Sequence, residues 1–168
     1  ALEERLQAML RGWGEAVEGE LAAAGEAGRA AAIAGRFAEA FPQSYRVEYG
    51  AAEAARDIER LRRLSLLETE EAHTPRRDTR LYSLDTDPHD RLRLKIYEYE
   101  GSLPLSDAVP ALENFGFRVL GEIPTVLDGG TLGTIHDFMV ELPEGVEVGA
   151  RVRSPEGVVQ GSKDEVIP

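Results

Sequence analysis

The sequence contains no cysteine, and this absence excludes a disulfide framework, a thiolate zinc site and a cysteine nucleophile. It is compatible with a reducing compartment, and we expect the protein to be cytoplasmic. Histidine is also scarce. The three histidines have no partner at the spacing of a metal site, so we expect no bound metal.

Long apolar runs and basic charge are both in short supply. No apolar segment approaches the roughly 18 residues of a membrane span, and the first ten residues are acidic and amphipathic, unlike a signal peptide. Asp and Glu number 31 against 19 Lys and Arg, which gives a net charge of −12. Because such a chain repels phosphate backbones and anionic lipids, we expect neither nucleic acid nor a membrane as a partner.

Seven of the arginines gather in the middle of the chain. Acidic residues alternate with them, so we interpret them as a solvated helix face rather than a binding patch. They are Arg56, Arg60, Arg62, Arg63, Arg76, Arg77 and Arg80.

The remaining composition fits an ordinary soluble domain. The 168 residues are 42% hydrophobic and 30% charged, which suits one domain with a helical arm. The first residue is not methionine, and both ends resemble cuts in a longer protein or processed ends. We therefore expect the chain to be a fragment.

Apolar spacing predicts two helical segments. Residues 1–40 read as a helix with a weak point at Gly25, and Pro42 ends this segment by moving Phe41 out of helical geometry. Residues 51–67 form the second helix. The first apolar stripe consists of Leu2, Leu6, Met9, Leu10, Trp13, Val17 and Leu21, and the second of Ala54, Ile58, Leu61 and Leu64.

Residues 68–78 are polar and aperiodic, and they predict a mobile loop. Period-two alternation then predicts strands at 79–85 and 90–100, joined by turn residues 86–89 into an antiparallel hairpin. The second strand places on one face Leu92, Leu94 and Ile96, and on the other Arg93, Lys95, Tyr97 and Tyr99.

A third helix is marked at both ends. Ser106 is expected to cap its start, and Gly116 supplies a left-handed stop. Strands at 117–127 and 134–142 follow, joined by an Asp-Gly-Gly turn at 128–130. The rest of the chain reads as irregular structure or a weak hairpin. The buried stripe of this helix is expected to consist of Val109, Leu112 and Phe115.

The order from 51 to 142 is helix, strand, strand, helix, strand, strand. It predicts an α+β, ferredoxin-like fold, with a four-stranded antiparallel sheet, two helices on one face and an N-terminal helical arm. The same order results when a βαββαβ unit starts at its first helix. Such a fold would leave no polar cleft in which ionisable groups converge.

Three motifs resemble a known family. The segments “FPQSY” and “DIERL”, the block “LPLSDAVPALENFGFRV” and the strand “IHDF” resemble the N-terminal half of the large bacterial NAD-dependent glutamate dehydrogenases. The resemblance covers about residues 40–142. The matching residues are Phe41, Pro42, Tyr45, Asp57, Ile58, Leu61, Leu103, Pro104, Leu105, Ser106, Asp107, Pro110, Leu112, Glu113, Asn114, Gly116, Arg118, Val119, Ile135, His136, Asp137 and Phe138.

In that family this region is one of several ACT-like modules, and the catalytic residues lie downstream. The resemblance implies an ACT-like domain at 46–142, between a helical connector at 1–45 and an irregular tail at 143–168. It implies no catalytic residue in this fragment. NAD would be the cofactor of the parent enzyme, which oxidatively deaminates L-glutamate to 2-oxoglutarate and ammonium. The implied partners are the rest of the parent chain, like subunits in a homo-oligomer and a small amino-acid effector.

The turn at 100–106 is the candidate ligand site. ACT modules bind small amino acids near a strand–helix turn, and Gly101, Ser102 and the N–H groups of Ser106 and Asp107 could receive a carboxylate. Asp107 argues against this role, because its own charge competes for the helix end. The alternative is a plain tight turn.

Two other patterns are weaker as sites. His136 and Asp137 are neighbours on a strand and point to opposite faces, so they cannot readily form an acid–base pair. The glycines of “GGTLG” at 129–133 join two strands without a helix, and no nucleotide-binding glycine motif occurs. We therefore expect this fragment to bind neither NAD nor ATP.

The favoured hypothesis is a non-catalytic regulatory or structural ACT-like segment of a large NAD-dependent glutamate dehydrogenase. A small independent enzyme would need a convergent polar pocket, which the pattern does not predict. The alternative is a stand-alone interaction protein that associates through a first helix exposing Leu6, Leu10, Trp13 and Val17.

Overall fold

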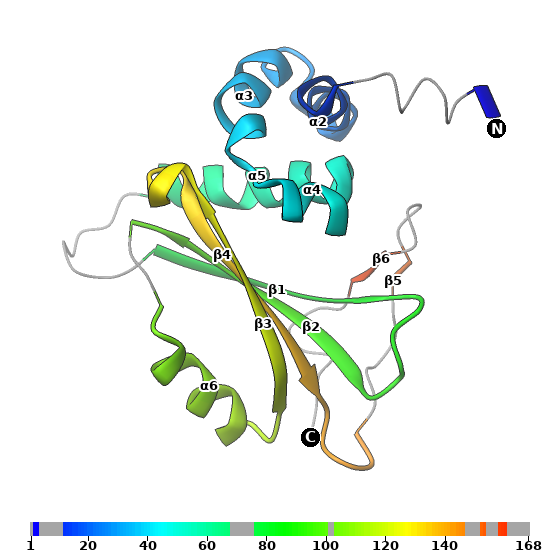
Figure 1. Cartoon of the computed structure of the whole chain (residues 1–168), viewed down its shortest axis with the longest axis vertical. Helices are drawn as coiled ribbons and strands as arrows, with labels where there is room; N and C mark the ends of the chain where they lie inside the picture. The colour runs from blue at the N-terminus through cyan, green and yellow to red at the C-terminus, as the bar shows by residue number, and fades with distance from the viewer. Residues whose placement is uncertain are drawn as a thin grey trace.

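The computed structural model describes residues 2–3, 12–67, 76–100 and 103–146, and the backbone of 152–153 and 158–160. A helical layer comes first along the chain, and a sheet follows it (Figure 1). The elements are α2 (Trp13–Leu21), the π-helical turn η1 (Ala22–Glu26), α3 (Ala30–Phe37), the 3-10 turn η2 (Ala38–Ala40), α4 (Gln43–Glu48), α5 (Gly50–Leu66), β1 (Arg76–Leu84), β2 (Arg91–Tyr99), α6 (Leu105–Asn114), β3 (Arg118–Leu127), the turn η3 (Asp128–Gly130), β4 (Gly133–Glu141), β5 (Val152–Arg153) and β6 (Val158–Gln160).

The helical layer breaks where the sequence predicts. Gly25 has a φ of +104°, a backbone angle that residues other than glycine rarely adopt. Because this angle is not helical, the helix cannot continue through Gly25. Phe41 has extended backbone, with a ψ of 124°, directly before Pro42. These predictions are confirmed, and α5 buries its predicted stripe of Ala54, Ile58, Leu61 and Leu64.

The sheet is antiparallel at every pairing that the structure describes, in the order β3-β4-β2-β1-β6-β5. Because β2 and β3 both pair antiparallel with β4, they run parallel to each other, with α6 as the crossover. This split βαβ arrangement is ferredoxin-like. The predicted α+β fold class, with four antiparallel strands behind a helical region, is therefore confirmed.

The C-terminal strands β5 and β6 form a hairpin that extends the sheet. β6 pairs with β1, where Ser83 lies opposite Val159. Of the two forms left open for this tail, the structure has the hairpin. The domain boundaries at 45/46 and 142/143 stay predictions.

The two helices that flank the sheet lie on opposite faces, so their predicted placement on one face is wrong (Figure 1). α5 packs on the face that carries Tyr97. α6 packs through Leu112 on the other face, which carries Leu94 and Phe138. The reason is that β2 is buried on both faces, since Lys95 and Tyr97 are as fully covered as the apolar residues Leu94 and Ile96 on the opposite face. The face of β2 that carries Lys95 and Tyr97 therefore needs a covering helix as much as the apolar face does.

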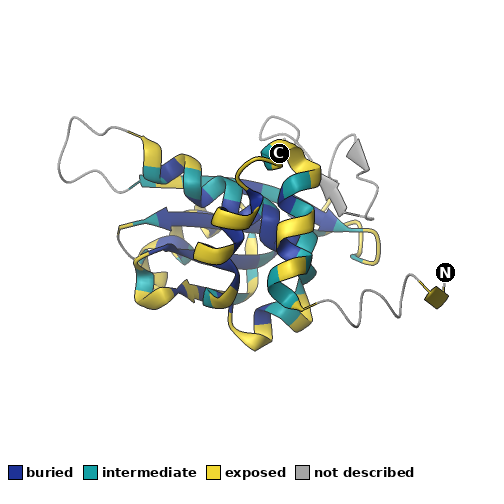
Figure 2. Cartoon of the chain, turned by 90° about the horizontal axis from the view of Figure 1, so that it is seen from above, coloured by how far each residue is buried: buried dark blue, intermediate teal, exposed yellow. Residues whose placement is uncertain are grey.

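The stripe of α2 is covered by the chain's own fold. Val17 and Leu21 are 0% and 1% exposed, and Trp13 is half-buried, with its indole N–H donating to the Ala38 carbonyl at 2.7 Å. The exposure of Trp13 and Val17 on which the stand-alone alternative depends is therefore not found, because the chain's own fold covers them. The helices in Figure 2 accordingly alternate exposed and buried residues. Three members of the predicted stripe lie outside the described residues: Leu6, Met9 and Leu10.

The boundaries of α6 differ slightly from the prediction. Pro104 is the N-cap and no side chain caps the helix, so the assignment of Ser106 as the cap is wrong. Gly116 ends the helix as predicted, with a φ of +86°. Phe115 is 76% exposed rather than buried, because it lies just beyond the last helical residue.

Most of the predicted mobile loop at 68–78 lies outside the described residues, and its last three residues already belong to β1. The strands β2, β3 and β4 fall within one or two residues of the predicted ranges. Among the residues that the structure describes, no helix combines the length and apolarity of a membrane span.

Candidate functional site

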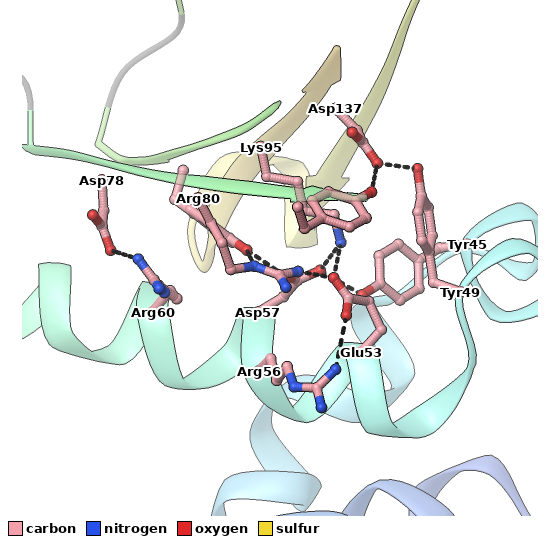
Figure 3. Close-up of polar contacts among 12 residues, drawn as sticks. Tyr45, Tyr49, Glu53, Arg56, Asp57, Arg60, Asp78, Arg80, Lys95 and Asp137 are labelled. Carbon is pink, nitrogen blue, oxygen red and sulfur yellow. Dashed lines mark hydrogen bonds and ion pairs between the residues drawn. The ribbon is translucent and has the colours of Figure 1, made fainter. Parts of the chain in front are cut away.

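A cluster of ionisable side chains is buried between α5 and the sheet (Figure 3). α5 contributes Glu53 and Asp57, β1 contributes Arg80 and β2 contributes Lys95. Their exposed fractions are 5%, 0%, 4% and 0%, in that order. These ionisable groups meet inside the packed core and not in an open polar cleft. The interpretation of Arg80 as part of a solvated helix face is wrong, because Arg80 is buried on β1. We call these four residues the ionic cluster.

Asp57 is the central acceptor of the ionic cluster. The hydroxyls of Tyr45 and Tyr97 donate to its carboxylate oxygens at 2.5 and 2.6 Å. Lys95 Nζ donates to it at 2.7 Å, and the Arg80 guanidinium lies 3.5 Å away. A buried carboxylate with this many donors has its hydrogen-bonding capacity satisfied without water.

Glu53 balances the charge of the ionic cluster. Lys95 Nζ donates to Oε1 at 2.8 Å, and the Arg80 guanidinium contacts the same oxygen. Arg56, a quarter exposed, lies 3.5 Å from the other oxygen. Two carboxylates from α5 thus meet two cations from the sheet.

Lys95 lies among tyrosine rings as well as carboxylates. Its Nζ is 4.3 Å from the ring centroid of Tyr49, and 5.5 and 5.6 Å from those of Tyr45 and Tyr82. Burial lowers the pKa of Lys95, while the adjacent Asp57 carboxylate acts in the opposite direction. The rings and carboxylates replace the water that an ammonium group loses on burial.

Asp137, on β4, lies beside the ionic cluster, and His136 does not. The hydroxyls of Tyr49 and Tyr82 both donate to Asp137 Oδ2, at 2.6 and 2.5 Å, and burial raises the pKa of Asp137. His136 Nδ1 instead lies 2.9 Å from a carboxylate oxygen of Glu122. As expected for neighbours on a strand, the two side chains contact different partners, and their lack of a catalytic role stays a prediction.

The two predicted ligand residues that the structure describes, Ser106 and Asp107, lie apart from the ionic cluster, at the start of α6 on the other side of the sheet (Figure 1). Gly101 and Ser102 lie outside the described residues. Ser106 and Asp107 are exposed in the first turn of α6. The structure does not bring them to the ionic cluster, and their role in ligand binding stays a prediction.

The ionic cluster is filled by its own side chains. A cavity of about 60 Å³ lies beside it, lined by Glu48, Tyr49, Glu53, Tyr82, Leu84 and Arg93. Sites for small molecules typically occupy about 300–1,000 Å³, so this cavity has room for a few water molecules only. Within the described ranges, no three His, Asp or Glu side chains are placed to hold one metal ion. The arrangement is suited to fastening α4 and α5 to the sheet.

Sequence reasoning missed the ionic cluster, although a signal was present. Asp57 falls on the apolar face of α5, directly beside Ile58 and one turn from Leu61. Lys95 lies on a strand whose neighbours at 94 and 96 are apolar. A charged residue on a buried face needs a partner, so each of these positions predicts a counter-charge across the core.

Raising the pH above 10 is expected to destabilise the chain steeply. Burial, reinforced by adjacent carboxylates, raises the pKa of four tyrosines, which stay protonated in the fold but ionise near pH 10 once unfolded. Their stabilisation is complete below pH 10 and is lost above it, by up to about 1.4 kcal/mol per pH unit for each tyrosine. Lys95, with its lowered pKa, opposes this trend only up to its ordinary pKa of 10.5. The tyrosines are Tyr45, Tyr49, Tyr82 and Tyr97.

Urea unfolding at neutral pH and at several values above 10 measures this slope. The Tyr45→Phe variant removes one titrating group, so its slope should be shallower by one tyrosine's share. A slope that is the same in both proteins would contradict the assignment of Tyr45 as a protonated group in the fold.

Two family models match the chain. Residues 20–64 match the description “Glutamate dehydrogenase, helical motif 2”, and residues 77–152 match “Glutamate dehydrogenase, ACT3 domain”. The first range contains Glu53 and Asp57, and the second contains Arg80 and Lys95. The ionic cluster therefore joins the two matched regions.

Two curated proteins are similar to most of the chain. The NAD-specific glutamate dehydrogenase of Halomonas elongata is 32% identical over 149 residues, which is 88% of this chain and 9% of that protein. The NAD-specific glutamate dehydrogenase of Pseudomonas aeruginosa is 35% identical over 114 residues, which is 67% of this chain and 7% of that protein. The chain thus spans less than a tenth of the length of either relative.

The fold and the matched regions define an ACT-like α+β module with an attached helical motif. Its antiparallel sheet and its helical layer are the parts that the two family models cover. The chain belongs to the NAD-dependent glutamate dehydrogenase family, and the resemblance predicted from its motifs is confirmed.

Proposed function

We propose that this chain is a non-catalytic regulatory or structural segment of a large NAD-dependent glutamate dehydrogenase. The parent enzyme oxidatively deaminates L-glutamate to 2-oxoglutarate and ammonium, and NAD binds outside residues 1–168. The segment contacts the rest of the parent chain and like subunits in a homo-oligomer, in the cytoplasm.

One observation carries this proposal: the ionisable groups that converge in the chain are engaged with one another. Asp57 and Lys95 are fully buried and bonded to each other at 2.7 Å. His136 and Asp137 face separate partners. General acid–base catalysis requires a group within hydrogen-bond reach of a substrate, and these groups have no such access.

The regulatory part of the proposal concerns the turn before α6. Ser106 and Asp107 are exposed in the first helical turn, where the Asp107 N–H already donates to the Pro104 carbonyl at 3.0 Å and the Ser106 N–H has no partner within the helix. In the proposed role, these two residues, with Gly101 and Ser102 of the preceding turn in the sequence, receive the carboxylate of a small amino-acid effector. The Asp107 carboxylate weakens that interaction, because it carries the same charge as the ligand.

Calorimetric titration of the purified chain with a panel of amino acids tests the effector site. We expect heat from one small amino acid, and an affinity about two- to fivefold higher in the Asp107→Asn variant, since a charge at a helix end contributes about 0.3–1 kcal/mol. Ser44→Ala, at an exposed position in α4, is the control that should change nothing.

Two results would contradict parts of the proposal. If no amino acid in the panel gives a heat of binding, the regulatory role is contradicted and a structural role remains. Turnover of glutamate with NAD by this chain alone would contradict its non-catalytic assignment.

The stand-alone interaction protein is not favoured. Its association surface was the stripe of the first helix, and Val17 and Leu21 of that stripe belong to the chain's own core. The matches to two regions of one enzyme family also favour a segment of a larger protein.

A further inference from the structure

We propose that the helical layer, α2–α5, and the sheet form one obligate folding unit, because each layer supplies the counter-charges that the other needs. The face of β1 and β2 that carries Arg80 and Lys95 is a docking surface for a helix with two carboxylates one turn apart. This inference goes beyond the regulatory role and does not require it.

The sheet by itself places like charges side by side. Arg80 on β1 and Lys95 on β2 are direct cross-strand partners, so both side chains lie on the same face. Like charges in that position destabilise a strand pair. Asp137 on β4 lies opposite Lys95 and offsets part of its positive charge, and Asp137 Oδ2 also accepts hydrogen bonds from the hydroxyls of Tyr49 and Tyr82. Without α5, this face keeps a net positive charge.

The inner face of α5 has the opposite excess, of negative charge. Glu53 and Asp57 are four residues apart on its inner face, and like charges at this spacing destabilise a helix. Arg56 lies 3.5 Å from Glu53 and offsets part of the repulsion. Asp57 finds its bonded donors elsewhere, from Lys95 and Tyr97 on the sheet and from Tyr45 on α4.

Docking of α5 on the sheet pairs the positive charges of the sheet face with the negative charges of the inner face of α5. Each cation of the sheet contacts each carboxylate of α5, with Lys95 Nζ at 2.8 Å from Glu53 and 2.7 Å from Asp57. All four groups are at least nine-tenths buried, and a buried charge that loses its partner is strongly destabilising. Neither layer therefore has a favourable state in which its charges are buried without the other.

The opposite face of the sheet shows that the charges select a particular helix. α6 packs there through Ala108 and Leu112 against Leu94, Phe138 and Val140, which are all apolar. Apolar contact alone would accept either helix on either face. The positive face accepts the helix with Glu53 and Asp57, which gives the two faces different specificities.

Native-state hydrogen exchange in increasing urea, read by mass spectrometry, tests the proposal on the whole chain. Peptides from α2–α3 and from β2–β4 should lose protection at the same urea concentration. The fluorescence of Trp13, the one tryptophan in the sequence, should change at the same midpoint.

Variants that change the charge balance test the cause. Lys95→Met and Asp57→Asn should each raise the opening constant by about 100-fold or more. The double variant removes one charge from each layer. Its opening constant should therefore be about tenfold lower than that of the less stable single variant. The matched control is the half-buried pair Arg60 and Asp78, which joins α5 to β1 at 2.9 Å. Arg60→Met and Asp78→Asn should have small, additive effects.

Three outcomes would overturn the proposal. Sheet peptides that stay protected after the helical layer has exchanged would contradict a single unit. An opening constant of the double variant as high as that of the less stable single variant would contradict mutual charge compensation. If Lys95→Met fails to fold, a folded double variant supports the proposal and an unfolded one contradicts it. These readouts follow folding, so they are independent of the calorimetric test of the effector site.

Discussion

Replacing Asp57 with alanine is expected to lower the free energy of unfolding by about 3–5 kcal/mol, the usual cost of breaking a buried ion pair by removing one partner. Lys95 and Arg80 would stay buried with Glu53 as their carboxylate contact within the ionic cluster. Two tyrosine hydroxyls would also lose their acceptor, which adds the cost of unsatisfied buried donors. Urea denaturation followed by the fluorescence of Trp13 measures the loss.

Asp78→Ala is the matched control for Asp57→Ala. Asp78 also pairs with an arginine of α5, Arg60, but both side chains are more than a quarter exposed. Exposed ion pairs contribute about 0–1 kcal/mol, so this variant should lose less than about 1 kcal/mol. Equal losses in the two variants would show that burial does not distinguish the ionic cluster from a surface pair.

Replacing Gly133 with alanine is expected to lower the free energy of unfolding by about 2–4 kcal/mol through overpacking and backbone strain. Gly133 begins β4 with a φ of +122°. An added Cβ would lie 2.6 Å from Leu61 Cδ2 and 2.9 Å from the Glu98 carbonyl oxygen. The Glu98 carbonyl belongs to the backbone of β2, so it cannot move away without distorting the sheet. Thermal or urea unfolding of the variant measures the cost.

Gly35→Ala provides the comparison for Gly133→Ala. Gly35 is exposed in α3, and nothing lies within 4 Å of the position that its Cβ would take. Because alanine favours a helix over glycine, this variant should gain up to about 1 kcal/mol. A Gly133→Ala variant as stable as Gly35→Ala would contradict the close packing of α5 against the start of β4.

Local elements were the most predictable part of the fold. The stripe of α5 and the alternation of β2 emerge from the helix and strand periods, which depend only on neighbouring residues. Gly116 and Pro42 mark boundaries for equally local reasons, since each restricts its own backbone or that of the preceding residue. Ser106 was misplaced as a cap because the helix starts two residues earlier, with Pro104 at the N-cap, and helix ends are the least certain part of a sequence-based prediction.

The ionic cluster was less predictable, although its residues were visible. The pattern placed Lys95 and Tyr97 on one face of β2 without indicating that a helix covers this face. Arg80 belongs to a run of arginines whose other members are mostly half-buried or exposed, and nothing local distinguishes it. The candidate ligand turn was predicted from the resemblance, and its location away from the ionic cluster became clear only from the face that α6 occupies.

The sequence by itself determined the order of helices and strands, the antiparallel pairing and the family, because these depend on local periods, turn residues and short motifs. Only the tertiary structure decided which face of the sheet each helix covers and which charges pair. The partners of Lys95 lie 38 and 42 residues away along the chain. Contacts at that separation are fixed by where whole elements meet in space, which local spacing does not encode.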